Sequence, residues 1–90
     1  MEREILLMSD AEFDVLDQLY FVSKLDQIQE EIDIQTEDLI HVLSQLHQKG
    51  WIKILETVDD EVSKEKLDLN NHAGQYFFLA TKEGLLAHNS

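Results

Sequence analysis

The residues best suited to hold a metal ion gather in one acidic, polar segment, residues 57–74. Within it, residues 59–70 begin like a calcium-binding loop, with carboxylates and a hydroxyl at alternating positions. The sixth position is Lys64 where that loop needs glycine, and the twelfth is Asn70 where it needs glutamate. The calcium-loop motif therefore fails.

A second cluster in the same segment, Asp68, Asn70, Asn71 and His72, offers carboxylate, amide and imidazole groups that bind divalent ions. The same residue types are frequent in strand connections, because their side chains hydrogen-bond the backbone of turns. We therefore expect a turn here and assign no metal ligand.

Catalytic groups are equally hard to assemble from this sequence. With no cysteine and three glycines, the chain offers no thiolate, no GxSxG turn and no phosphate-cradling glycine loop. The adjacent carboxylates at 30–31 and 59–61 fit solvated charge on polar segments. His41 and His47 are six residues apart, on different faces of a predicted helix. We expect no catalytic residue, no enzymatic activity and no cofactor.

The charge of the chain limits its partners. Asp plus Glu number 19 against seven Lys plus Arg, giving a net charge of −12, and no long segment is basic. Such a surface repels nucleic acid at long range, because DNA attracts proteins chiefly through Lys and Arg. The sequence also has no apolar run long enough to span a membrane and no basic leader. We expect a cytoplasmic protein that does not bind membranes.

The elements that position these side chains follow from periodicity and capping signals. Ser9 and Glu12 form a capping box before a helix that we expect to continue to about Val22. Its buried stripe is Phe13, Leu16, Leu19 and Tyr20. Ser23 is placed to cap a second helix and Thr36 a third, and Gly50 ends the third helix because glycine adopts the left-handed conformation without steric cost.

The third predicted helix has two distinct faces. Leu39, Val42, Leu43 and Leu46 cluster on one side at 100° per residue. The opposite side is polar and free to contact a partner, and it comprises Glu37, His41, Ser44, Gln45 and Gln48.

Two runs with high β propensity follow the third helix. Residues 51–56 and 75–80 are expected to pair as an antiparallel hairpin, with Phe77 buried and residues 57–74 forming a long loop. Thr81 is placed to cap a last short helix. Ninety residues then make one α+β domain, covering residues 1–90.

This order of elements resembles the winged helix-turn-helix of bacterial transcription regulators, especially the multiple-antibiotic-resistance and PadR-like types. The resemblance covers residues 11–88, with the helix-turn-helix at about 24–49 and the wing at about 51–80. The wing exit Leu79-Ala80-Thr81-Lys82-Glu83-Gly84 is similar to the family's LTxxG-like pattern. The matching core positions are Leu25, Ile28, Ile32, Ile34, Leu39, Leu43, Leu46, Gly50, Trp51 and Ile52.

The resemblance implies a small winged helix, with a three-helix core, a β-hairpin wing and a short C-terminal helix. It also implies that residues 36–49 form a recognition helix, in which Thr36, Glu37, His41 and Gln45 face a partner. The first turn carries Glu37 and Asp38 where such helices usually have small or basic residues, and the only base of the helix is Lys49.

Two functions fit these observations. A non-catalytic winged-helix module would use its acidic recognition face, Thr36, Glu37, Asp38, His41, Gln45 and Gln48, to bind a protein. The alternative is a DNA-binding transcriptional regulator, acting as a dimer or with a basic partner, whose best phosphate-binding patch is Lys64 with Lys66 in the wing. The apolar segment 5–8 fits two arrangements: it crosses the core, or it pairs with a second copy in a homodimer.

Overall fold

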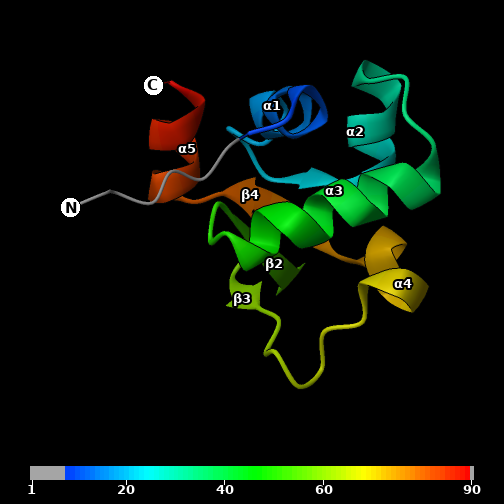
Figure 1. Ribbon diagram of the computed structural model, residues 1–90. Helices are drawn as coiled ribbons and strands as arrows, with labels where there is room; N and C mark the ends of the chain where they lie inside the picture. The colour runs from blue at the N-terminus through cyan, green and yellow to red at the C-terminus, as the bar shows by residue number, and fades with distance from the viewer. Residues whose placement is uncertain (1–7, 90) are drawn as a thin grey trace.

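The computed structural model describes residues 8–89 and shows an α+β domain in which helices pack on a small antiparallel sheet (Figure 1). The four strands lie in the order β1-β4-β2-β3. The long helix α3 crosses in front of the sheet in this view, and α1 and α2 lie above it. The element bounds are α1 Asp10–Asp17, β1 Ser23–Lys24, α2 Leu25–Glu31, α3 Thr36–Gln48, β2 Ile52–Thr57, β3 Asp60–Glu61, α4 Leu69–His72, β4 Phe77–Ala80 and α5 Lys82–His88.

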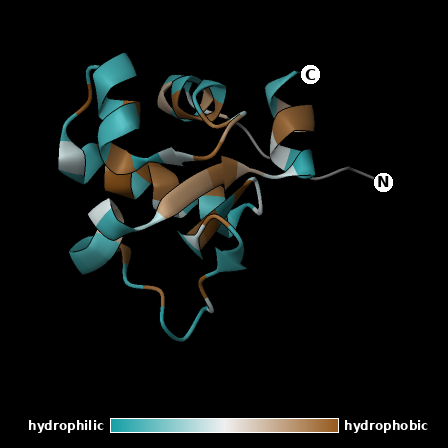
Figure 2. Ribbon diagram, turned by 180° about the vertical axis from the view of Figure 1, so that it is seen from behind, coloured by the Kyte–Doolittle hydropathy of each residue, from teal (hydrophilic) through white to brown (hydrophobic). Residues whose placement is uncertain are grey.

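The core lies between the helices and one face of the sheet. Helices α1, α2 and α3 contribute buried apolar side chains, α4 and α5 pack partly buried ones against them, and strands β2 and β4 contribute the side chains that alternate toward the helices. The side chains that are essentially inaccessible to solvent are Val15, Leu16, Leu19, Ile28, Leu39, Leu43, Leu46, Ile54 and Phe78. Seen from behind, β4 is an apolar ribbon with no helix in front of it (Figure 2).

Helix α1 begins as expected and ends earlier than expected. Ser9 accepts a hydrogen bond from the Glu12 N–H at 3.1 Å, and Glu12 accepts one from the Ser9 N–H at 2.9 Å, so the predicted capping box is confirmed. The prediction that the helix reaches Val22 is wrong. The Leu19 carbonyl accepts from the Ala80 N–H at 2.9 Å, and this contact with the end of β4 draws the chain out of the helix.

This early ending creates strand β1, which periodicity did not predict. Ser23 lies opposite Phe78 and Lys24 opposite Phe77, so Ser23 belongs to the sheet and does not cap α2. Lys24 is the N-cap residue of α2, and its backbone N–H donates to the Gln27 Oε1 at 2.7 Å.

The predicted pairing of the two long strands is confirmed. Strand β2 runs antiparallel to β4, with Ile54 opposite Phe78 and Lys53 opposite Leu79. The register corrects one assignment, because Phe78 faces the core and Phe77 is half-buried on the outer side. A side chain's face follows from its pairing, and a shift of one residue reverses it.

The connection between these strands contains more structure than the predicted loop. Strand β3 returns directly against β2, and α4 with a turn of 3₁₀ helix at 73–75 leads into β4. The remaining open segment, between β3 and α4, forms the lowest part of the molecule in Figure 1.

The junction between α3 and β2 is fastened to the start of α5. Gly50 has φ of +78°, which confirms its predicted left-handed conformation after the helix. Its carbonyl accepts from the Thr81 hydroxyl at 2.7 Å, and the Trp51 carbonyl accepts from the Thr81 N–H at 2.9 Å. Thr81 also caps α5 as predicted, accepting from the Gly84 N–H at 3.0 Å. The buried Trp51 is thereby held where helix, sheet and α5 meet.

Candidate functional site

The outward side of α3 is one continuous polar face. Ser44 is half-buried, the other residues predicted to face a partner are exposed, and the apolar stripe on the opposite side is buried. We call these exposed residues the α3 face: Thr36, Glu37, Asp38, His41, Gln45 and Gln48.

The start of the α3 face is fixed by α2. The Gln29 Nε2 donates to the Thr36 hydroxyl at 2.9 Å across the four-residue turn between the helices. Thr36 is thus the first residue of α3, whereas Gln35 occupies the N-cap position without a side-chain hydrogen bond, so the expected Thr36 cap is wrong. Glu37 and Asp38 lie in the first turn, where their negative charge interacts favourably with the helix dipole.

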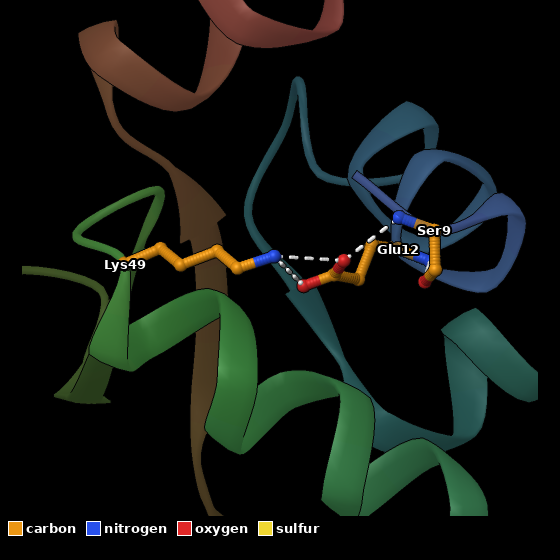
Figure 3. A network of polar contacts seen from close by, with 3 residues as sticks. All are labelled: Ser9, Glu12 and Lys49. Atoms are coloured by element: carbon orange, nitrogen blue, oxygen red, sulfur yellow. Dashed lines mark hydrogen bonds and ion pairs between the residues drawn. The ribbon is translucent and has the colours of Figure 1, made fainter. Parts of the chain in front are cut away.

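The end of α3 is fixed by an ion pair with α1 (Figure 3). The Lys49 Nζ donates to both carboxylate oxygens of Glu12, at 2.7 and 2.9 Å. The Glu12 side chain is 3 % exposed and that of Lys49 is 22 % exposed. The Lys49 ammonium also lies 4.8 Å from the centroid of the Trp51 ring, within the range of a cation–π contact.

This environment shifts the acidity of Glu12. Burial disfavours the carboxylate, but the hydrogen bonds and the positive charge of Lys49, together with the Ser9 N–H, outweigh it and hold the pKa of Glu12 below its ordinary value of 4.5. Glu12 therefore stays charged at neutral pH, and the single lysine at the end of α3 is directed inward to neutralise it.

Sequence reasoning missed this pair, although one signal was present. Glu12 shares the three-, four- and seven-residue spacing of Val15, Leu16 and Leu19, which places a carboxylate on the buried side of α1. A carboxylate in that position requires a cation or several hydrogen bonds. Its partner is 37 residues away in the chain, and no local pattern identifies it.

Lys64 and Lys66, which the sequence predicts to lie in a wing, are in the open segment between β3 and α4, and both are exposed. A turn holds them, because the Ser63 carbonyl accepts from the N–H groups of Lys66 and Leu67 at 3.1 and 3.0 Å. Exposed Glu65 lies between the two lysines, so the patch carries a small net positive charge.

The Asp68 cluster serves as a helix start. Asp68 caps α4 by accepting from the Asn71 side-chain amide at 2.9 Å and from its backbone N–H at 3.3 Å. The amide hydrogen bond of Asn71 is the main reason that the pKa of Asp68 lies below its usual value of 3.8. Across residues 8–89, no three His, Asp or Glu side chains stand close enough to hold a metal ion.

Two further expectations concern the rest of the surface. The segment proposed to pair with a second copy falls mostly on residues 5–7, outside the described residues, and Met8 packs partly buried against the core. Among residues 8–89, no helix has the length and apolar character needed to cross a membrane.

The geometry thus defines a small α+β domain that presents one acidic and polar helix face. A scan against protein-family models and searches of curated proteins and of solved structures find no match to this chain.

Proposed function

We propose that this chain is a winged-helix binding module whose α3 face docks a protein partner. The order of its elements supports the winged helix. Helices α2 and α3 are joined by four residues, the turn length typical of a helix-turn-helix, and α3 leads directly into the antiparallel pair β2 and β4. In such folds the second helix of the motif presents its outer side to the partner.

The observation that carries the function is the charge of the α3 face. Its first turn exposes Glu37 and Asp38, and no lysine or arginine lies between Lys24 and Lys49. Lys49, which follows the last turn of α3, is paired with Glu12. The α3 face is therefore built to accept hydrogen bonds and positive charge.

Phosphate contacts are too few for tight DNA binding. A protein that neutralises about six to ten phosphates loses about 10³ to 10⁵ in affinity between 50 and 200 mM salt, because each contact releases counterions. The whole chain has seven Lys and Arg, and Lys49 already has a partner. A basic or polar protein surface fits the α3 face better, since carboxylates pair with Arg and Lys while His41, Gln45 and Gln48 supply directional hydrogen bonds.

An electrophoretic shift experiment tests whether the chain lacks tight DNA binding. We expect no shift of random or genomic duplexes by the purified protein at 50 mM salt. Tight, salt-sensitive and sequence-selective binding would overturn the proposal.

A pull-down tests the positive claim. The tagged chain is incubated with lysate with and without nuclease, and we expect a partner that is retained after nuclease treatment. The double variant Glu37→Gln/Asp38→Asn should lose this partner. The variant Asp59→Asn/Glu61→Gln removes the same charge from the β2–β3 hairpin and should retain it. Loss of the partner with both variants, or only after nuclease treatment, contradicts binding through the α3 face.

The alternative, a DNA-binding regulator acting as a dimer or with a basic partner, draws on one observation. Lys64 and Lys66 are exposed in the same turn, where a wing approaches a DNA backbone. Under this alternative, Lys64→Ala/Lys66→Ala lowers affinity for every duplex alike, because phosphate contacts carry no sequence information. Unchanged binding in this variant would remove the alternative.

A further inference from the structure

Three aromatic side chains at the α1 end of the molecule remain exposed. Phe13 is 45 %, Tyr20 39 % and Phe21 82 % accessible. We call them the aromatic face. The prediction that Phe13 and Tyr20 belong to the buried stripe of the first helix is wrong. Leu16 and Leu19 are buried as expected, and Val15 joins them on that side. Phe13 and Tyr20 both contact His88, and Phe21 follows Tyr20 in the chain. Exposed apolar side chains that gather on a surface mark an interaction site in many soluble proteins.

The aromatic face is held in position by α5. The Phe13 ring stacks on His88 with centroids 4.1 Å apart, and the Tyr20 ring meets His88 edge-on at 5.4 Å. The Tyr20 hydroxyl hydrogen-bonds the His88 Nδ1 at 2.8 Å and accepts from the Asn89 amide at 3.0 Å. Phe13 and Tyr20 are thus fixed before any partner arrives, which lowers the entropic cost of binding.

Three carboxylates of α1 lie to one side of Phe13. Asp10, Asp14 and Asp17 are exposed, and the helical spacing puts all three within about 100° of arc on the same side of α1 as Phe13. Asp17 lies 3.5 Å from the His88 Nε2. Asp10 and Asp14 have no cationic partner among residues 8–89. The result is an apolar strip with an acidic border.

The negative charge of this border indicates which kind of partner can bind the aromatic face. A second copy would bring the same three aspartates against each other, between chains of net charge −12. Nucleic acids and anionic lipid surfaces are repelled for the same reason. A helix with an apolar stripe bordered by bases matches an apolar strip with an acidic border, as in the charge pairs beside the apolar seam of coiled coils. Arginine suits the border better than lysine, because guanidinium stacks on aromatic rings and pairs with carboxylates in a planar fork.

We propose that the aromatic face docks an arginine-rich amphipathic helix of a partner protein. This surface is separate from the α3 face, since α1 turns Glu12 toward α3 while Phe13 and Asp17 lie against α5. The inference therefore stands or falls independently of the proposed function.

A defined peptide tests the proposal. The probe is a fluorescein-labelled helix of about 14 residues, or four turns, with leucine along one stripe and arginine on both flanks. We expect it to bind the full chain in a fluorescence anisotropy titration, more weakly as salt increases. A version with lysine in place of arginine should bind several-fold more weakly, and a glutamate version should not bind.

Matched variants show whether the peptide binds at the aromatic face. Phe21→Ala should weaken binding by about tenfold, as for an interface anchor, and Asp14→Asn by a few fold with a smaller salt dependence. Val58→Ala removes an apolar side chain that is 60 % exposed at the far hairpin, and Asp59→Asn removes a charge there, so both should bind as the unchanged protein does.

Three outcomes would overturn the proposal. The arginine peptide fails to bind, or Phe21→Ala binds it as tightly as the unchanged chain, or sedimentation shows a homodimer that Phe21→Ala dissociates. A peptide lost in Glu37→Gln/Asp38→Asn and retained in Phe21→Ala would bind the α3 face instead. That result would contradict the aromatic face and leave the proposed function intact.

Discussion

Replacing Lys49 with methionine isolates the contribution of the ion pair that joins α1 to α3. Methionine keeps most of the apolar stem that lies beside Trp51 and removes only the ammonium group. The Glu12 carboxylate then remains buried, and among the described residues the Ser9 N–H is its remaining hydrogen-bond donor. The substitution therefore tests how much the charge of Lys49 contributes to the stability of the fold.

The expected cost follows from burial. Removing one partner of a fully buried pair costs about 3–5 kcal/mol, because the other charge is left without compensation. Lys49 is 22 % exposed, so water reaches this pair and the cost is lower. The penalty for burying an unpaired carboxylate has an upper limit, because the protein can protonate Glu12 instead. At pH 7, protonating a carboxyl with an ordinary pKa of 4.5 requires about 3.4 kcal/mol, at about 1.36 kcal/mol per pH unit. We expect a loss of about 2–3 kcal/mol, which lowers Tm by about 10–20 °C in a domain of this size.

The loss of stability in Lys49→Met should depend on pH in a defined direction. In the unchanged chain the pKa of Glu12 is lowered, so its contribution to stability is complete above 4.5 and is lost as pH falls through the folded-state pKa. In Lys49→Met burial acts without a counter-charge and raises the pKa of Glu12, so the penalty grows as pH rises above 4.5. The stability difference between the two proteins should therefore increase from pH 4 to pH 7.

Urea denaturation at several pH values measures this difference without adding salt. Lys53→Met is the matched control, because Lys53 is exposed on β2 and the same charge is removed; its effect should stay within about 0.5 kcal/mol. A double-mutant cycle with Glu12→Gln, which keeps a side-chain oxygen for the capping box, measures the coupling itself. The reasoning is refuted if Lys49→Met is as stable as Lys53→Met at pH 7, or if their difference does not change with pH.

Two further predictions test other contacts of the fold. Gly84→Ala should destabilise the protein by about 1–3 kcal/mol in thermal melts, because the new Cβ would overlap the Trp51 carbonyl, whereas Gly74→Ala, with open space at that position, should change little; equal stability of the two variants would contradict this packing. In a carbon-detected NMR titration, the Asp68 carboxyl should protonate at lower pH than a solvated aspartate, because Asn71 donates to its charged form, and Asn71→Ala should raise that midpoint. A midpoint unaffected by Asn71→Ala would show that the hydrogen bond from Asn71 does not lower the pKa of Asp68.

Local signals predicted some beginnings and ends of elements, although the expected Ser23 and Thr36 caps and the helix end at Val22 are wrong. The Ser9 capping box, the Gly50 turn and the Thr81 cap depend on residues within a few positions, and all three are confirmed. The exposed side of α3 was also predictable, because helical periodicity fixes which residues share a face.

The errors in α1, in β1 and in the direction of Phe78 share one physical cause, contact between distant parts of the chain. Helix α1 stops because Leu19 bonds to Ala80, 61 residues later, and β1 exists because β4 pairs with it. The inward direction of Phe78 depends on the register between β2 and β4. Neither effect leaves a periodic trace in the local sequence, since the competing helical pattern continues through Tyr20.

The same kind of long-range contact decides how the α3 face should be interpreted. From the sequence, Lys49 is the one positive charge that the predicted recognition helix could offer a phosphate. In the fold it neutralises Glu12, so releasing it toward DNA would leave a buried carboxylate unpaired and cost much of the 2–3 kcal/mol expected for Lys49→Met, about 30- to 150-fold in affinity. A partner that meets the α3 face without recruiting Lys49 avoids that loss. The ion pair that stabilises the domain is therefore also an argument for a protein partner over a phosphate backbone.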